Sequence, residues 1–141
     1  MESSDHFKTD SSQQPAAPGR FFHVDDIKPV EYVAGLSFRP VLGEQTLTNF
    51  VHYEPNTEAP LHNHVEEQVV VVLEGELEFE IDGEIRTMRP GDVAVIPPWV
   101  PHRARTYDGT CTQIDFFNPP RNNLVEYART ARDAVGEIAG S

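Results

Sequence analysis

Two histidines separated by a single residue, His62 and His64, are followed four positions later by a glutamine, Gln68. In an extended strand these three side chains point to the same side, because successive side chains alternate between the two faces. Imidazole nitrogens are common ligands of divalent transition metals, so paired imidazoles on one face can chelate an ion. A third histidine, His102, follows the segment "PPWVP", whose prolines restrict the backbone and reduce the entropy lost in holding a ligand geometry. The pattern indicates a metal site, although a His-x-His pair alone also occurs in strands that bind no metal.

Short β-strands are the elements that must position these residues. Runs rich in β-branched and aromatic residues are separated by turn residues, as in "TLTNFVHY", "VVVVL", "ELEFEI" and "TCTQIDFF". In "ELEFEI" apolar residues alternate with glutamates, which predicts one core face and one solvent face. Asp82-Gly83 follows at once and is a strong hairpin signal. Many short strands without intervening helices predict an all-β sandwich or barrel.

The two ends of the chain differ from this β-rich centre. Residues 1–19 are rich in Ser, Gln, Pro and charge, so we expect a disordered tail before a barrel at 20–121. Residues 122–141 should form a helix and a short tail, with Asn123 capping the helix. Its apolar residues recur at helical spacing: Leu124, Tyr127, Ala128, Ala131 and Val135.

Composition restricts the partners. The 141 residues carry a net charge of −12, which opposes binding to nucleic acid or to anionic lipid. No apolar run approaches the ~20 residues of a membrane span, and a single cysteine, Cys111, cannot form an internal disulfide, so we expect a cytoplasmic protein. The valine run at 69–72 is apolar on both faces, which predicts a strand covered by the core on one side and by a second subunit on the other. We therefore expect a homodimer that binds a small-molecule substrate.

The ligand spacing resembles that of a single-domain cupin, whose fold is a double-stranded β-helix, or jelly-roll barrel. That family's first motif is Gly, five residues, His-x-His, three or four residues, Glu, six residues, Gly. The corresponding residues here are Asn56, His62, His64, Gln68 and Gly75. The second motif is Gly, five residues, Pro-x-Gly, two residues, His, three residues, Asn. Here it corresponds to Gly91, Pro97, Trp99, His102 and Thr106. Asn56 is a mild departure, since Asn tolerates positive φ, whereas Trp99 in place of Gly predicts a different path for the loop before His102.

The resemblance implies that His62, His64, Gln68 and His102 hold a divalent metal, with Zn, Fe, Ni, Mn and Cu all compatible. Gln68 is a neutral acceptor where the family has a carboxylate, so the ion keeps its full positive charge. This favours polarisation of a carbonyl or enolate over one-electron oxidation. Glu66 or Glu67 could replace Gln68 if the strand is bulged.

The segment "DFFNPPR" resembles the end of the pectin-degradation cupins, which convert unsaturated uronates into linear keto sugars. Their pattern Asp-x-Phe-x-Pro-x-Arg corresponds to Asp115, Phe117, Pro119 and Arg121. The resemblance implies that Asp115 moves a proton, that Arg121 binds a substrate carboxylate and that Phe117 shapes the pocket. A similar histidine and glutamine pattern occurs in other cupin isomerases and cyclases.

Three functions are compatible with these residues. The first is a metal-dependent enzyme that isomerises, ring-opens, cyclises or dehydrates a small anionic keto, enol or sugar-acid substrate. The second is an iron dioxygenase. The third is a cupin that binds a small molecule without catalysis.

Overall fold

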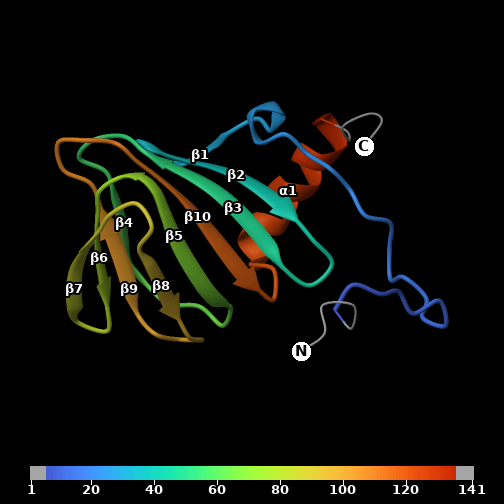
Figure 1. Cartoon of the computed structure of the whole chain (residues 1–141). Helices are drawn as coiled ribbons and strands as arrows, with labels where there is room; N and C mark the ends of the chain where they lie inside the picture. Colours follow the sequence, from blue (N-terminus) through green and yellow to red (C-terminus); the bar gives the residue numbers. More distant parts are fainter. Residues whose placement is uncertain (1–5, 136–141) are drawn as a thin grey trace.

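In the described part of the chain, residues 6–135 of the computed structural model, ten strands form two antiparallel sheets and one helix follows them (Figure 1). Side chains are described up to residue 129. The six-stranded sheet has the order β1 (Val30–Val33), β2 (Leu36–Leu42), β3 (Leu47–Tyr53), β10 (Cys111–Asn118), β5 (Glu67–Gly75) and β8 (Val93–Ile96). The four-stranded sheet has the order β4 (Glu58–His62), β9 (His102–Arg105), β6 (Leu77–Ile81) and β7 (Glu84–Met88). The prediction of an all-β fold with a C-terminal helix is confirmed.

The hydrophobic core lies between the two sheets, and both contribute alternate residues to it. Along β10 the buried positions are Cys111, Gln113, Asp115 and Phe117, so alternate residues of this strand face the interior. Leu47 and Ile96 of the large sheet and Leu77 of the small sheet have no exposed surface. Burial of each such side chain contributes roughly 1.5–3 kcal/mol. The core therefore fixes which side of each strand faces the interior.

Two turns show why particular residues are required. Asp82 and Gly83, which join β6 to β7, both have positive φ, at 47° and 87°, as the predicted tight hairpin turn needs. Gly75 ends β5 with φ at 80°, and a Cβ atom there would lie 2.0 Å from the carbonyl oxygen of Thr110. Only glycine fits this close approach, which lets β5 turn directly into β6.

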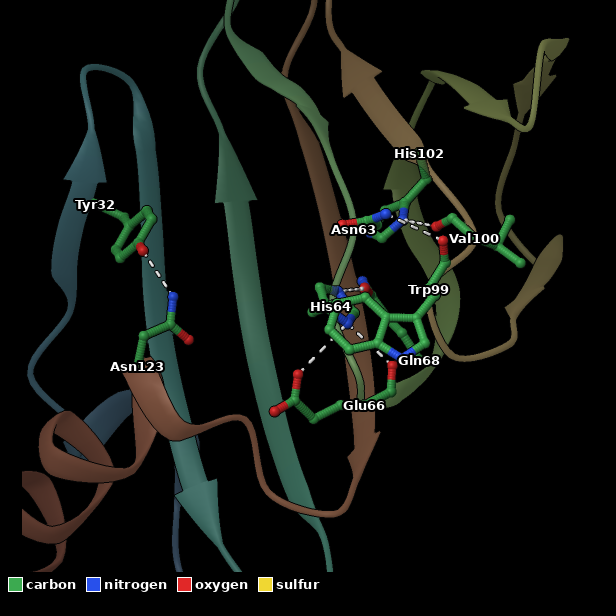
Figure 2. A network of polar contacts seen from close by, with 9 residues as sticks. All are labelled: Tyr32, Asn63, His64, Glu66, Gln68, Trp99, Val100, His102 and Asn123. Atoms are coloured by element: carbon green, nitrogen blue, oxygen red, sulfur yellow. Dashed lines mark hydrogen bonds and ion pairs between the residues drawn. The ribbon is translucent and has the colours of Figure 1, made fainter.

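The C-terminal helix α1 (Asn122–Val135) packs against β2 and buries Leu124 and Ala128. The helix begins at Asn122, so the prediction that Asn123 caps it is wrong. Asn123 Nδ2 instead donates a hydrogen bond of 2.8 Å to Tyr32 Oη on β1 (Figure 2). This contact ties the helix to the edge of the large sheet.

The described residues before β1 contain one short 3-10 helix, η2 (Val24–Asp26), and residues 6–19 carry no helix or strand. The part of the expected tail at residues 1–5 lies outside the described residues. Ile27 anchors this segment, because its side chain is 2% exposed. No helix among the described residues has the length and apolarity needed to cross a membrane.

Candidate metal centre

Three histidines from different segments converge at one end of the core. His62 is the last residue of β4, His64 lies in the connection to β5, and His102 is the first residue of β9. His62 and His102 are paired across the β4–β9 ladder, which brings their ring centroids to 4.3 Å. One ring nitrogen from each of the three histidines lies within 4.8 Å of the others. Strand pairing and the short connection after β4 therefore create the cluster that the sequence predicted.

Each histidine also contacts a backbone carbonyl through its other ring nitrogen. The Nδ1 atoms of His62, His64 and His102 lie 2.7, 2.9 and 2.9 Å from the carbonyl oxygens of Pro60, Glu66 and Val100, respectively. A carbonyl oxygen can only accept a hydrogen bond, so each Nδ1 atom carries the proton of the neutral ring and each Nε2 atom keeps its lone pair. Metal-binding histidines in proteins are oriented by such hydrogen bonds.

Burial keeps these imidazoles neutral. Desolvation lowers the pKa of all three histidines, and it brings the pKa of His102 to about 4 despite the opposing hydrogen bond to Val100. The positive charge of Arg121 lowers each pKa further. A neutral imidazole is the form that can bind a metal, so burial favours the metal-binding form of each ring.

The side chain of Gln68 completes the donor set. Its Oε1 atom lies 3.1 Å from Nε2 of His64, while its amide hydrogen-bonds Asp115 on the other side. Both facing atoms carry lone pairs once His64 holds its proton on Nδ1, and two such atoms repel unless a cation lies between them. Nε2 of His102 is also buried without a hydrogen-bond partner among the described residues. These residues fit a divalent metal held by three nitrogens and one oxygen.

Neither neighbouring glutamate takes the position of Gln68. Glu66 is buried, but its Oε1 atom lies 3.5 Å from Nδ1 of His64, on the side of the ring that points away from the cluster. Glu67 is exposed on the opposite face of β5. The alternative that a strand bulge brings one of them to the metal is therefore wrong.

Asp115 lies deep in the same region, on the inward face of β10. Gln113 Nε2 donates a hydrogen bond of 2.8 Å to Asp115 Oδ1. Burial raises the pKa of Asp115 to about 7, although hydrogen bonds from Gln68 and Gln113 and the charge of Arg121 pull it downward. A carboxyl group with such a pKa exchanges a proton readily near neutral pH. Gln113 was not among the predicted site residues; its parity with Asp115 is the signal that points to it.

Phe117 and Arg121 lie next to the histidines. The Phe117 side chain is 2% exposed, and its ring meets that of His64 edge-on at 5.8 Å. The Arg121 guanidinium carbon lies 5.8 Å from the centroid of the Phe117 ring. Phe117 therefore forms a wall of the site, and Arg121 extends over that wall from the segment between β10 and α1.

A small cavity of about 50 Å³ connects these groups. Its lining includes His62, Gln68, His102, Asp115 and Arg121. The other lining residues are Arg103, Gln113 and six apolar or aromatic side chains from both sheets: Leu36, Phe38, Tyr53, Ala59, Phe79 and Ala104. Every lining residue except Arg121 belongs to a strand. The structure thus brings three of the proposed metal ligands, the acid and the arginine to one cavity.

The loop before His102 keeps the backbone conformation that glycine would adopt there. Trp99 has a φ of 68°, in the left-handed region, and Asn56 in the first motif has a φ of 54°. The Trp99 amide donates a hydrogen bond of 2.8 Å to the His64 carbonyl oxygen, and Asn63 Nδ2 donates one of 3.2 Å to the Trp99 carbonyl oxygen (Figure 2). Tryptophan thus occupies a left-handed position, and its side chain is 60% exposed. The expected change in loop path stays a prediction.

Known proteins resemble parts or most of this chain. Residues 49–112 match the sequence family described as the cupin domain. L-ectoine synthase of Hahella chejuensis is 36% identical over 69 residues, which cover 48% of this chain and 52% of that protein. Dimethylsulfoniopropionate lyase DddQ of Ruegeria pomeroyi is 38% identical over 65 residues, 45% of this chain and 32% of that protein. The matched segment spans about half of the first curated relative and a third of the second.

A solved structure matches over a longer range. The structure of KdgF from Halomonas sp. superposes with a TM-score of 0.72 and is 26% identical in sequence. The superposition covers 76% of this chain and 99% of that one. The whole of that smaller chain therefore has its counterpart within this one.

Proposed function

Because residues 49–112 match the cupin domain family, we propose that the chain is a metal-dependent enzyme that rearranges a small anionic substrate without net oxidation. The reaction class is isomerisation, ring opening, cyclisation or dehydration of a keto, enol or sugar acid. The observation that carries this proposal is the convergence of three neutral imidazoles and a neutral amide oxygen beside a buried acid and an arginine.

His62, His64, Gln68 and His102 are the residues that would hold the ion. A bound divalent metal would act as a Lewis acid on a carbonyl or enolate oxygen of the substrate. The donor set itself carries no negative charge, which suits recognition of an anion and does not favour a higher oxidation state of an iron ion. This supports a redox-neutral reaction over the dioxygenase alternative.

Asp115 is the residue that we propose moves the proton. Its carboxyl group is buried and held by Gln113, so the oxygen atoms have fixed positions in the cavity. An ionised Asp115 removes a proton from a substrate hydroxyl or α-carbon, and the same oxygen returns it to a neighbouring atom. No electron is gained or lost in this exchange, and general acid–base catalysis of this kind contributes typically 10²–10⁴-fold.

Arg121 is the residue that we propose binds the carboxylate of the substrate. A guanidinium can donate two parallel hydrogen bonds to a carboxylate, which fixes the orientation as well as the charge. The cavity of about 50 Å³ is small beside the ~300–1,000 Å³ of typical ligand pockets. Because Arg121 alone among the lining residues lies outside a strand, we propose that its side chain moves outward as a larger substrate enters.

The resemblances support the reaction class. The sequence pattern around Asp115 and Arg121 is similar to that of the uronate-linearising cupins, and the KdgF structure matches along its whole length. The two curated relatives are a synthase and a lyase by name, and each shares sequence with slightly less than half of this chain. An unsaturated uronate is therefore the first substrate to test, followed by cyclisable keto acids.

The test begins with the full chain purified without chelators, its metal content measured by mass spectrometry. Metal-loaded and chelated samples are then incubated under nitrogen with an unsaturated uronate and with keto acids, and products are followed by proton NMR. We expect turnover that needs the metal and proceeds without oxygen. Turnover that depends on oxygen would overturn the proposed reaction class, and a chain that binds no divalent metal would leave the non-catalytic alternative.

A further inference from the structure

We propose that Glu66 supplies, through the ring of His64, the negative charge that the metal donor set lacks. This inference rests on the metal site of the proposed function and assigns a positioning role to a residue outside the donor set. Glu66 lies in the connection between β4 and β5, two residues after His64.

Glu66 contacts the proton-bearing nitrogen of His64 through two of its own groups. Its backbone carbonyl oxygen lies 2.9 Å from His64 Nδ1, and its carboxylate Oε1 lies 3.5 Å from the same atom. Figure 2 shows the carboxylate on the side of the ring opposite to Gln68. The backbone carbonyl of Glu66 accepts the hydrogen bond from Nδ1, the carboxylate lies beside the same atom as an ion-pair contact, and Nε2 is left to face the cluster.

The burial of Glu66 needs an explanation. Its side chain is 7% exposed, and a buried carboxylate is strongly destabilising unless a cation or several hydrogen bonds offset the lost hydration. Its ion-pair partner among the described residues is His64, whose ring is neutral in the form that binds metal. A divalent cation on Nε2 of the same ring would provide the compensating charge.

Such an arrangement strengthens a metal site. A carboxylate close to the proton-bearing nitrogen of an imidazole makes the other nitrogen a better donor. The hydrogen bond to the backbone carbonyl of Glu66 fixes the ring orientation. Since Gln68 occupies the place of a carboxylate ligand, Glu66 restores one negative charge near the ion without contacting it. The ion then keeps an all-neutral set of direct ligands.

Glu67 provides a matched control. It is the next residue in the chain and has the same side chain, yet it points to the outer face of β5 and is exposed. Glu66→Gln and Glu67→Gln change the net charge equally and keep the side-chain shape. A difference between them therefore reports the position of Glu66 and not the total charge of the protein.

The experiment measures Zn²⁺ affinity of the full chain by competition with a chromophoric chelator, together with the melting temperature of each metal-free variant. We expect Glu66→Gln to weaken Zn²⁺ binding by about 10–100-fold. Glu67→Gln should change the affinity by no more than about twofold, because exposed charges are well screened. The metal-free Glu66→Gln variant should melt at the same temperature as the parent chain or higher, since it loses a buried charge.

A purely structural role predicts the opposite pattern, with a lower melting temperature and an unchanged affinity. Glu66→Asp separates the two cases further, because it restores the charge and should recover part of the affinity. Equal Zn²⁺ affinity of Glu66→Gln and Glu67→Gln would overturn the inference and leave the proposed function intact. Absence of Zn²⁺ binding by the parent chain would instead overturn the metal site itself.

Discussion

The amide oxygen of Gln68 lies 3.1 Å from Nε2 of His64, and both atoms carry lone pairs because His64 holds its proton on Nδ1. On its other side the Gln68 amide hydrogen-bonds Asp115. One glutamine thus links the proposed metal ligands to the proposed proton carrier. Because the Gln68 side chain is uncharged, it adds no negative charge either to the metal ligands or next to Asp115.

Gln68→Glu places a carboxylate between the histidines and Asp115. We expect tighter Zn²⁺ binding by about tenfold or more, or at least 1.4 kcal/mol. We also expect slower turnover, because the added charge reduces the Lewis acidity of the ion and repels the Asp115 carboxylate. Chelator competition and steady-state kinetics measure the two effects. A variant with unchanged affinity and unchanged turnover would show that Gln68 does not contact the metal.

Asp115→Asn keeps the shape of the side chain and removes its ability to carry a proton. We expect the metal content to stay the same and kcat to fall by about 10²–10⁴-fold. In the parent chain the rate should rise with pH as Asp115 loses its proton. Its pKa is about 7 without metal, and a bound cation should lower this pKa because it favours the ionised carboxylate. Measurement of metal content beside the pH–rate profile separates lost chemistry from lost metal. Undiminished turnover would remove Asp115 from its assigned role.

The raised pKa of Asp115 also predicts how stability changes with pH in the metal-free protein. The folded pKa of about 7 lies above the ordinary value of 3.8, so the folded state binds the proton more tightly than the unfolded state does. The free energy of unfolding should therefore fall as pH rises from about 4 to 7, by up to about 4 kcal/mol from this group. Asp115→Asn should flatten this part of the profile, as measured by urea unfolding at pH 5 and pH 8. An equally steep profile in the variant would assign the change to other groups.

The outer face of the six-stranded sheet bears on the predicted homodimer. Val93 and Val95 on β8 are 57% and 56% exposed, and they pair with Val71 and Val69 on β5. These four valines make a continuous apolar surface of the kind that a second subunit covers. We expect Val95→Lys to convert a dimer into a monomer, as measured by light scattering after size exclusion.

Ile85→Lys is the matched control for that experiment. Ile85 is 54% exposed, but it lies on β7 of the other sheet. We expect this variant to keep the mass of the parent chain. A parent chain that is already monomeric at high concentration would contradict the predicted dimer.

Much of the site could be predicted from the sequence, because strand parity and turn residues are local properties. The alternation that buries Gln113, Asp115 and Phe117 is visible in the order of residues, as is the turn at Asp82-Gly83. The position of Glu66 could not be predicted, since it depends on how the connection after β4 bends. The conformation at Trp99 was also missed, because its backbone hydrogen bond to His64 joins segments that are 35 residues apart. Features such as the position of Glu66 and the conformation at Trp99 depend on contacts between distant segments, which local sequence patterns do not reveal.

The hydrogen bonds that orient the three histidines all end on main-chain carbonyls, those of Pro60, Glu66 and Val100. Replacing the side chains of these three residues would leave the acceptors in place, provided that the backbone keeps its course. The cavity walls, by contrast, consist of side chains such as Leu36, Phe38 and Ala59, so a substitution at these positions changes the wall directly. Substitutions in the cavity wall can therefore change which substrate fits while the backbone groups that orient the histidines stay in place. The wall positions are the ones to vary in directed evolution of new substrate specificity.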